Sequence, residues 1–143
     1  RSDPRNNQTG WSFVARPYNF DSAAGINYTV DITKPAGERI EISSMADGSA
    51  FDPDAEYHVA VTSYRASGAG GLLTEGAGIP EPELEKRIVH RYPEIREILY
   101  DFVKEYGLID ESAICNSSLY GEWKFIPEDL ATEKISADLK RMF

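Results

Sequence analysis

The stretch from Tyr57 to Gly71 changes character at Tyr64, and this change constrains the fold more than any other feature of the sequence. Residues 57–63 are rich in β-branched and aromatic side chains, which is typical of a buried strand. Residues 66–71 are small and include three glycines, which neither a strand nor a helix tolerates for long. We therefore expect Tyr64 to end a strand, with its ring beside a loop of little side-chain bulk. A flat ligand could stack on that ring; the alternative is a core tyrosine followed by an ordinary turn.

Strict alternation of apolar and polar residues predicts a second strand over residues 25–33, with Ile26, Tyr28, Val30 and Ile32 on one face. Residues 39–43 predict an antiparallel neighbour with Ile40 and Ile42 turned inward. Turns are expected at Asp47-Gly48 and at residues 52–54, so that three antiparallel strands lead to Tyr64. Short strands are also predicted at residues 11–14 and, closing the sheet, at residues 123–126.

Two helices are predicted after the glycine-rich loop. The first covers residues 83–90, and the second covers residues 93–106, with Pro93 as its first residue and Gly107 as its C-cap. The second helix carries an apolar stripe at three-four spacing, which should pack on the core. The predicted fold class is α+β, with a mainly antiparallel sheet packed by one longer and one short α-helix. Residues 1–10 should be a flexible lead-in, residues 11–127 the domain, and residues 128–143 a peripheral helix or tail.

Composition and charge exclude several functions. A net charge of −9 argues against a nucleic-acid polymer or an anionic membrane surface as partner, because both require basic patches. No apolar run is long enough to span a membrane, and no signal-like segment is present. Cys115 is the only cysteine, so it can form no intrachain disulfide. Because Arg1 is not a natural start, we expect the chain to be part of a longer protein.

The sequence offers no catalytic or metal-binding constellation. Only two histidines occur, His58 and His90, and neither has clustered Asp or His neighbours of the kind that a two-metal phosphoesterase site requires. The acidic pair Glu81 and Glu83 fits the start of a helix. A second flexible stretch, residues 74–78, follows the glycine-rich one, and two such stretches in one connection suggest a functional loop. We predict no catalytic residue and no metal ligand in this chain.

Four blocks in order carry a family resemblance: Tyr18-Asn19-Phe20-Asp21-Ser22-Ala23-Ala24-Gly25-Ile26, Val30-Asp31-Ile32-Thr33-Lys34-Pro35, Asp47-Gly48, and Ser63-Tyr64-Arg65-Ala66-Ser67-Gly68. Residues 76–80 and 122–127 add to it. Together they resemble the C-terminal domain of the 5′-nucleotidase family, with the closest similarity to its 2′,3′-cyclic-nucleotide 2′-phosphodiesterase/3′-nucleotidase branch. The N-terminal part of that domain and the metallophosphoesterase domain of the family are absent from this chain.

The resemblance implies that metal binding and nucleobase binding are carried by different domains. In the family, the N-terminal metallophosphoesterase domain holds two divalent metal ions, and the C-terminal domain sandwiches the nucleobase between two aromatic rings. Tyr64 matches the second ring, while the first lies upstream of this chain. The ribose-binding aspartate of 5′-nucleotidases would fall near Gly70, which carries no carboxylate and so puts ribose recognition in doubt. The substrate-binding residues implied are Tyr64, Arg65, Ser67, Gly68 and Gly70, with Tyr18 and Asn19 as further candidates.

Two main functional hypotheses follow. In the first, this chain is the nucleotide-binding portion of a metal-dependent phosphoester hydrolase and is not catalytic by itself. Its partners would be a nucleotide or nucleoside and the metallophosphoesterase domain of the same protein, in an extracytoplasmic location, periplasmic or at the cell surface, as the resemblance implies. In the second, it is a stand-alone ligand-binding or interaction module. An unrelated small α+β domain with a purely structural glycine loop is a further alternative.

Overall fold

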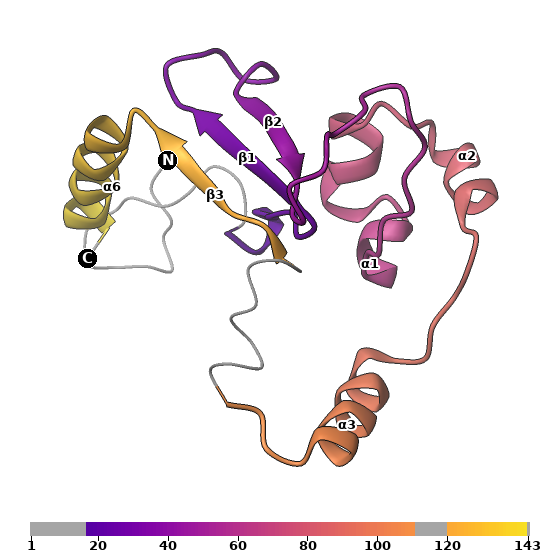
Figure 1. Cartoon of the computed structure of the whole chain (residues 1–143). Coiled ribbons are helices and arrows are strands. Elements are labelled where there is room, and N and C mark those ends of the chain that lie inside the picture. Colours follow the sequence, from indigo (N-terminus) through magenta and orange to yellow (C-terminus); the bar gives the residue numbers. More distant parts are fainter. Residues whose placement is uncertain (1–16, 111–119, 143) are drawn as a thin grey trace. The chain divides into compact units, whose positions relative to one another are not determined.

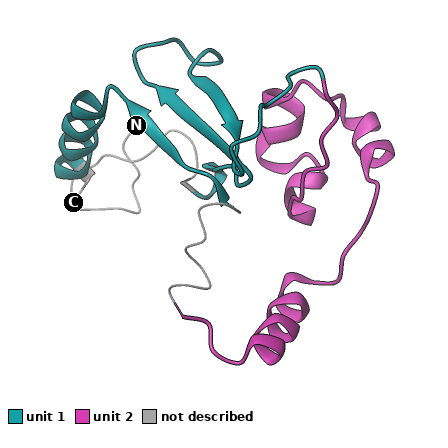
Figure 2. Ribbon diagram, in the orientation of Figure 1, with its two compact units in different colours: residues 1–54, 116–143 teal, residues 55–115 magenta. Residues whose placement is uncertain are grey.

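The computed structural model describes residues 17–110 and 120–142. The chain divides into two compact units, shown in teal and magenta in Figure 2. Unit 1 combines residues 1–54 with residues 116–143, and unit 2 is the continuous segment 55–115. The expectations for residues 1–10, for a strand at residues 11–14 and for Cys115 lie outside the described residues.

Unit 1 contains a three-stranded sheet made of β1 (Ile26–Asp31), β2 (Ile40–Met45) and β3 (Trp123–Ile126), in the order β2-β1-β3 (Figure 1). β2 pairs with β1 antiparallel, whereas β3 pairs with β1 parallel. The strands predicted from alternation and the closing strand are thus confirmed, as is the α+β fold class. β3 reaches the sheet from almost one hundred residues further along the chain, and sequence periodicity carries no information on such a pairing.

Asn27 connects the three strands through its side chain. Its amide nitrogen donates to Ser44 Oγ at 2.8 Å and to the Met45 carbonyl at 2.9 Å, while its amide oxygen accepts from the Glu122 N–H at 2.7 Å. The register of β1 against β2 shifts between Asn27 and Tyr28, which is the place where a β-bulge turns a side chain toward new partners. The asparagine therefore satisfies backbone groups that the interrupted ladder leaves without strand partners.

The core of unit 1 is small and aromatic. Tyr28 is only 7% exposed and stacks on the Trp123 ring, with centroids 5.7 Å apart and planes 8° from parallel. Phe125 meets the same tryptophan edge-on. Helix α6 (Glu128–Met142) packs on β3 and buries Ala131, so the final stretch is a helix rather than a tail. Ile40 was predicted to point inward but is 65% exposed, because nothing described covers that end of edge strand β2.

Short aspartate turns connect the elements of unit 1. Asp31 accepts hydrogen bonds from the hydroxyl and N–H groups of Thr33, and Asp47 does the same for Ser49. These bonds to the ionised form hold the pKa of both carboxyls below their ordinary value. The turn predicted at Asp47-Gly48 is confirmed, and so is the one at residues 52–54, where the Asp54 N–H donates to Asp52.

Unit 2 is helical, and three short elements surround its glycine-rich stretch. Helix α1 (Ser63–Ala66) is followed by the 3₁₀ turn η2 (Ala69–Gly71) and the π-helical turn η3 (Leu72–Gly76). Helix α2 (Glu81–Leu84) continues as the 3₁₀ turn η4 (Glu85–Arg87). The helix predicted over residues 83–90 is therefore present but starts two residues earlier and ends at Arg87.

Helix α3 (Ile95–Tyr106) confirms the second predicted helix with a different start. Glu94 is its N-cap, so Pro93 lies just outside the helix instead of being its first residue. Gly107 ends the helix as predicted, with a positive φ of 75° and an N–H that donates to the Val103 carbonyl at 2.8 Å. A left-handed conformation of this kind favours glycine.

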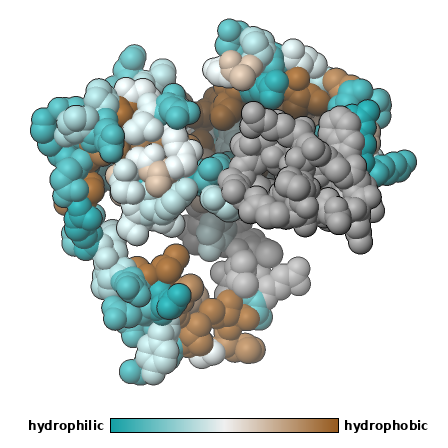
Figure 3. All heavy atoms as spheres, turned by 180° about the vertical axis from the view of Figure 1, so that it is seen from behind, coloured by the Kyte–Doolittle hydropathy of each residue, from teal (hydrophilic) through white to brown (hydrophobic). Residues whose placement is uncertain are grey.

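The apolar stripe of α3 is not buried. Leu99 is 54% exposed and Phe102 38% exposed, which contradicts the prediction that this helix packs on the core. Figure 3 shows hydrophobic residues in brown on the surface of this helix, in the lower part of the view. The periodicity correctly predicted an amphipathic helix, but an apolar face is buried only where another element is available to cover it.

None of the helices in the described residues is both long enough and apolar enough to cross a bilayer.

Candidate functional site

Residues 57–62, predicted as the strand that leads to Tyr64, are extended but belong to no strand of the described sheet. Tyr57, Val59 and Val61 are exposed, Val59 to 75%. The prediction of a strand here is wrong for the described chain, and only two strands, not three, precede Tyr64 in the sheet. Strand propensity is realised only when a neighbouring strand takes up the backbone hydrogen bonds.

Tyr64 lies in the one-turn helix α1 rather than at the end of a strand. Thr62 caps this helix, its hydroxyl oxygen accepting from the Arg65 N–H at 3.4 Å. At the other end the Ser67 hydroxyl donates to the Tyr64 carbonyl at 2.9 Å. The Tyr64 side chain is part of this short, capped turn and stays about half exposed, at 48%.

The loop after α1 depends on glycine. Gly68, Gly70 and Gly71 have φ values of 87°, 74° and 74°, a region that other L-residues rarely adopt. At Gly68 a Cβ atom would also come within 3.0 Å of Leu84 Cδ1 and 3.2 Å of Thr74 Cγ2. Leu84 is one of the few buried residues of this unit, at 6% exposure. The glycines thus let the loop fold closely onto α2.

Arg65 faces the protein rather than the solvent. It is 5% exposed, and its Nη1 donates to the Ala69 carbonyl at 3.2 Å. Its guanidinium carbon lies over the Tyr64 ring, 5.3 Å from the ring centroid. The side chain of Arg65, which the resemblance implies as a substrate-binding residue, thus lies between the tyrosine ring and the glycine loop.

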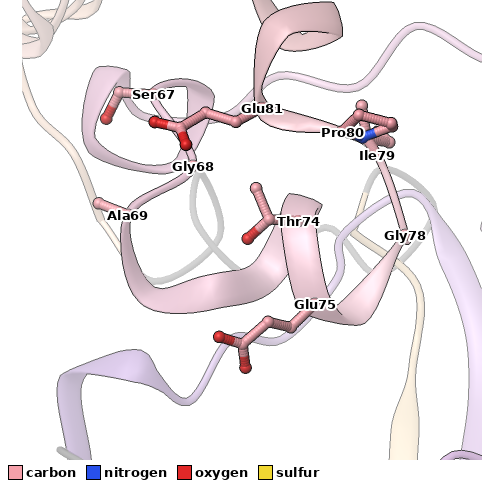
Figure 4. Close-up of a pocket in the computed structure, with 9 residues that line it drawn as sticks. All are labelled: Ser67, Gly68, Ala69, Thr74, Glu75, Gly78, Ile79, Pro80 and Glu81. Atoms are coloured by element: carbon pink, nitrogen blue, oxygen red, sulfur yellow. The ribbon is translucent and has the colours of Figure 1, made fainter.

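An open pocket of about 580 Å³ lies beside this loop (Figure 4). One wall consists of Ser67, Gly68 and Ala69, a second of Thr74 and Glu75, and a third of residues 78–81. In Figure 4 the Glu81 carboxylate extends toward Ser67 and Gly68, the Thr74 side chain points into the space between the walls, and the Glu75 carboxylate points away from it. Of the expected substrate-binding residues, Ser67 and Gly68 line this pocket, whereas Tyr64, Arg65 and Gly70 do not.

The chemistry of the pocket is that of a hydrogen-bond acceptor. Glu75 and Glu81 are both lining residues, and the Glu81 carboxylate is the one that faces Ser67 and Gly68. The Ser67 hydroxyl donates its hydrogen bond to the Tyr64 carbonyl, so its oxygen is left as an acceptor, and no lysine or arginine is among the lining residues. Such a lining suits hydroxyl and amino groups and repels phosphate. The sequence assigned Glu81 only to the start of a helix. The feature of the sequence that did indicate a functional loop at this pocket was the second flexible stretch, residues 74–78.

The remaining candidates lie elsewhere. Tyr18 and Asn19 belong to unit 1, in the one-turn helix η1 (Pro17–Asn19). His58 lies exposed in the extended segment, and His90 packs edge-on against Tyr92 at 4.4 Å. Across residues 17–110 and 120–142, no group of three or more His, Cys, Asp or Glu side chains could hold a metal ion. The described residues therefore do not fit a two-metal centre.

The α+β fold and the aromatic and glycine-rich loop are features of a 5′-nucleotidase-type C-terminal domain. Residues 5–75, about half of the chain, match the family model of the 5′-nucleotidase C-terminal domain. Through this segment the chain belongs to the 5′-nucleotidase C-terminal domain family.

Two curated proteins are similar to this chain. One is the 2′,3′-cyclic-nucleotide 2′-phosphodiesterase/3′-nucleotidase of Haemophilus influenzae, 34% identical over 124 residues that cover 78% of this chain. The other is the trifunctional nucleotide phosphoesterase protein YfkN of Bacillus subtilis, 32% identical over 115 residues and 73% of this chain. The aligned region spans only 17% and 7% of the lengths of these relatives. None of the solved structures matches this chain.

Proposed function

We propose that this chain is the nucleoside-binding portion of a metal-dependent nucleotide phosphoester hydrolase and that it does not catalyse hydrolysis by itself. The observation that carries the proposal is the half-exposed Tyr64 ring at the start of a loop built from Gly68, Gly70 and Gly71. An exposed ring next to a backbone without side-chain bulk leaves room for a flat base to stack. Both similar proteins are named as nucleotide phosphoesterases, which supports a nucleotide as the ligand class.

The charge of the pocket supports a division between nucleoside and phosphate. The Glu81 carboxylate, which faces Ser67 and Gly68, suits the hydroxyl groups of ribose or the amino groups of a base, and the acidic lining disfavours an anionic phosphate. The phosphate would therefore be held outside this chain. In this proposal two divalent metal ions in a separate metallophosphoesterase domain of the same protein hold it and supply the hydrolytic chemistry. An extracytoplasmic location is part of the same proposal.

Substitution of Tyr64 in the full-length protein tests the stacking role. Tyr64→Ala should raise KM for nucleotides roughly tenfold or more with little change in kcat, since base stacking is worth about 1–3 kcal/mol and 1.4 kcal/mol corresponds to about tenfold in affinity. Tyr64→Phe should be mild, because the ring face and not the hydroxyl makes the contact. Tyr100→Ala, which removes another exposed tyrosine from α3, is the matched control and should leave KM unchanged. An unaltered KM for Tyr64→Ala would refute the proposal.

The non-catalytic status of this chain is tested separately. Phosphate release is measured with 2′,3′-cyclic AMP, 3′-AMP and 5′-AMP, in the presence of manganese or zinc. We expect no turnover by the isolated chain, because its described residues offer no metal-ligand set. Turnover that co-purifies with the chain through successive columns and is lost on removal of the metal would overturn this part. Nucleoside binding without hydrolysis by the full-length protein would favour a stand-alone binding module instead.

A further inference from the structure

Arg65 combines deep burial with specific contacts inside its own turn, and this combination is unusual for an arginine. With 5% of its surface exposed, its charge has been withdrawn from water, which is unfavourable unless the guanidinium finds partners inside the protein. One partner is the Ala69 carbonyl, at 3.2 Å from Nη1, and another is the face of the Tyr64 ring, 5.3 Å from the guanidinium carbon. Both partners belong to the turn that carries the candidate stacking residue.

We propose that Arg65 is a positioning residue that sets the orientation of the Tyr64 ring and so acts on the ligand through that ring. This inference rests on the proposed function, since it assumes that Tyr64 stacks on a nucleobase. The guanidinium covers one face of the ring, and the opposite face remains for the ligand. Arg65 itself makes no contact with the ligand, because its side chain is enclosed by the protein.

Two physical effects couple the arginine to the tyrosine. A cation over an aromatic face is attracted by the ring quadrupole, and the attraction is stronger when the cation is withdrawn from water, as the Arg65 guanidinium is. The bond to Ala69 fixes the guanidinium to the loop that Gly68 and Gly70 shape. The ring and the pocket wall formed by residues 67–69 are therefore held in one arrangement before a ligand arrives, which lowers the entropic cost of binding.

Arginine is required for this role because its guanidinium is planar and presents several N–H donors. It can lie flat over a ring and donate to a carbonyl at the same time. Lysine retains the charge but has a compact ammonium group, which cannot satisfy both contacts with the same geometry. Arg65→Lys should therefore retain part of the effect, whereas the uncharged Arg65→Met, of similar length, should lose it.

A double-mutant cycle in the full-length protein tests whether Arg65 acts through Tyr64. The dissociation constant of adenosine is measured by calorimetry for the wild type, Arg65→Met, Tyr64→Ala and the double variant. We expect Arg65→Met to weaken binding about three- to tenfold. In the Tyr64→Ala background the same change should have less than about a twofold effect, because the ring through which it acts is gone. Arg87→Met, at an exposed position of the same unit, is the control and should bind normally.

The inference depends on how the loss of affinity in Arg65→Met changes when the Tyr64 ring is absent. Equal losses from Arg65→Met with and without the Tyr64 ring would overturn the inference, since the arginine would then act independently of the tyrosine. If Arg65→Met does not fold, Arg65→Lys replaces it in the cycle with the same criterion, and the expected loss of affinity for adenosine is about twofold to threefold.

The orientation of the ring is tested independently by ¹⁹F NMR. With a fluorotyrosine at position 64, the ¹⁹F resonance should shift in Arg65→Lys and should stay unchanged in Arg87→Met. Failure of Tyr64→Ala alone to weaken binding would instead refute the proposed function.

Discussion

The side-chain oxygen of Asn27 accepts a hydrogen bond from the backbone N–H of Glu122 at 2.7 Å, and this bond joins residues that are 95 positions apart in the sequence. The same side chain donates to Ser44 and Met45 on the other side of β1. One polar residue thus holds both neighbours of the central strand at the place where the register shifts.

Asn27→Ala should lower the free energy of unfolding of the chain by about 1–3 kcal/mol, because it leaves the Met45 carbonyl and the Glu122 N–H without their partner. Urea denaturation followed by circular dichroism measures the change. Ser43→Ala removes a single bond, from the Ser43 hydroxyl to the Asn27 carbonyl, and should cost less than about 1 kcal/mol. Equal losses of unfolding free energy in the two variants would show that the bonds of the Asn27 side chain stabilise the sheet no more than the single Ser43 bond does.

Gly121→Ala should destabilise unit 1 more than an ordinary glycine substitution. Gly121 has a φ of 76°, and a Cβ atom there would collide with the backbone of Ile26. Gly78 has a similar φ of 67°, but open space surrounds its missing Cβ. Gly78→Ala should therefore lower the free energy of unfolding only by the cost of holding an alanine at positive φ, about 1–2 kcal/mol. Gly121→Ala should lower it distinctly more, because the collision with Ile26 is added. Similar unfolding midpoints for the two variants would contradict the close approach of residue 121 to β1.

Leu99→Ala should cost less than about 1 kcal/mol in this chain, because the side chain is 54% exposed and little apolar surface is lost from contact. Leu84→Ala is the comparison: Leu84 is 6% exposed and packs against the Gly68 turn, so its loss should cost about 2–5 kcal/mol. Thermal and urea unfolding of both variants provide the measurement. A loss above 2 kcal/mol for Leu99→Ala would mean that the apolar face of α3 is covered in solution.

The turn at Asp31 should respond to acid. The Thr33 hydroxyl and N–H hold the pKa of Asp31 below its ordinary value of 3.8, so the turn is stabilised while the carboxyl is ionised. A carboxyl with a lowered pKa contributes stability above the pKa of the unfolded chain and loses it as the pH falls through the folded value. An NMR titration of the carboxyl carbon should show this lowered pKa. Thr33→Ala removes the hydroxyl bond and should move the pKa upward, and an unchanged titration would exclude that hydrogen bond as its main cause.

The local elements of this fold could be predicted because their causes are local. Alternation over residues 25–33 predicts β1, and the three-four spacing of residues 95–106 predicts α3, since both patterns follow from the geometry of the elements themselves. The stop at Gly107 and the turn at Asp47-Gly48 follow from the conformations that glycine permits. The order of the four blocks around Tyr64 was likewise sufficient to indicate the family.

Tertiary structure decided what depends on a distant partner. Residues 57–62 have strand composition but no strand beside them, and the α3 stripe has no covering element, so both predictions of burial were wrong in the described chain. The parallel pairing of β3 with β1 joins segments almost one hundred residues apart, which no periodicity relates. A sequence specifies the conformations that each segment can adopt, whereas contacts between segments determine which of its surfaces are covered.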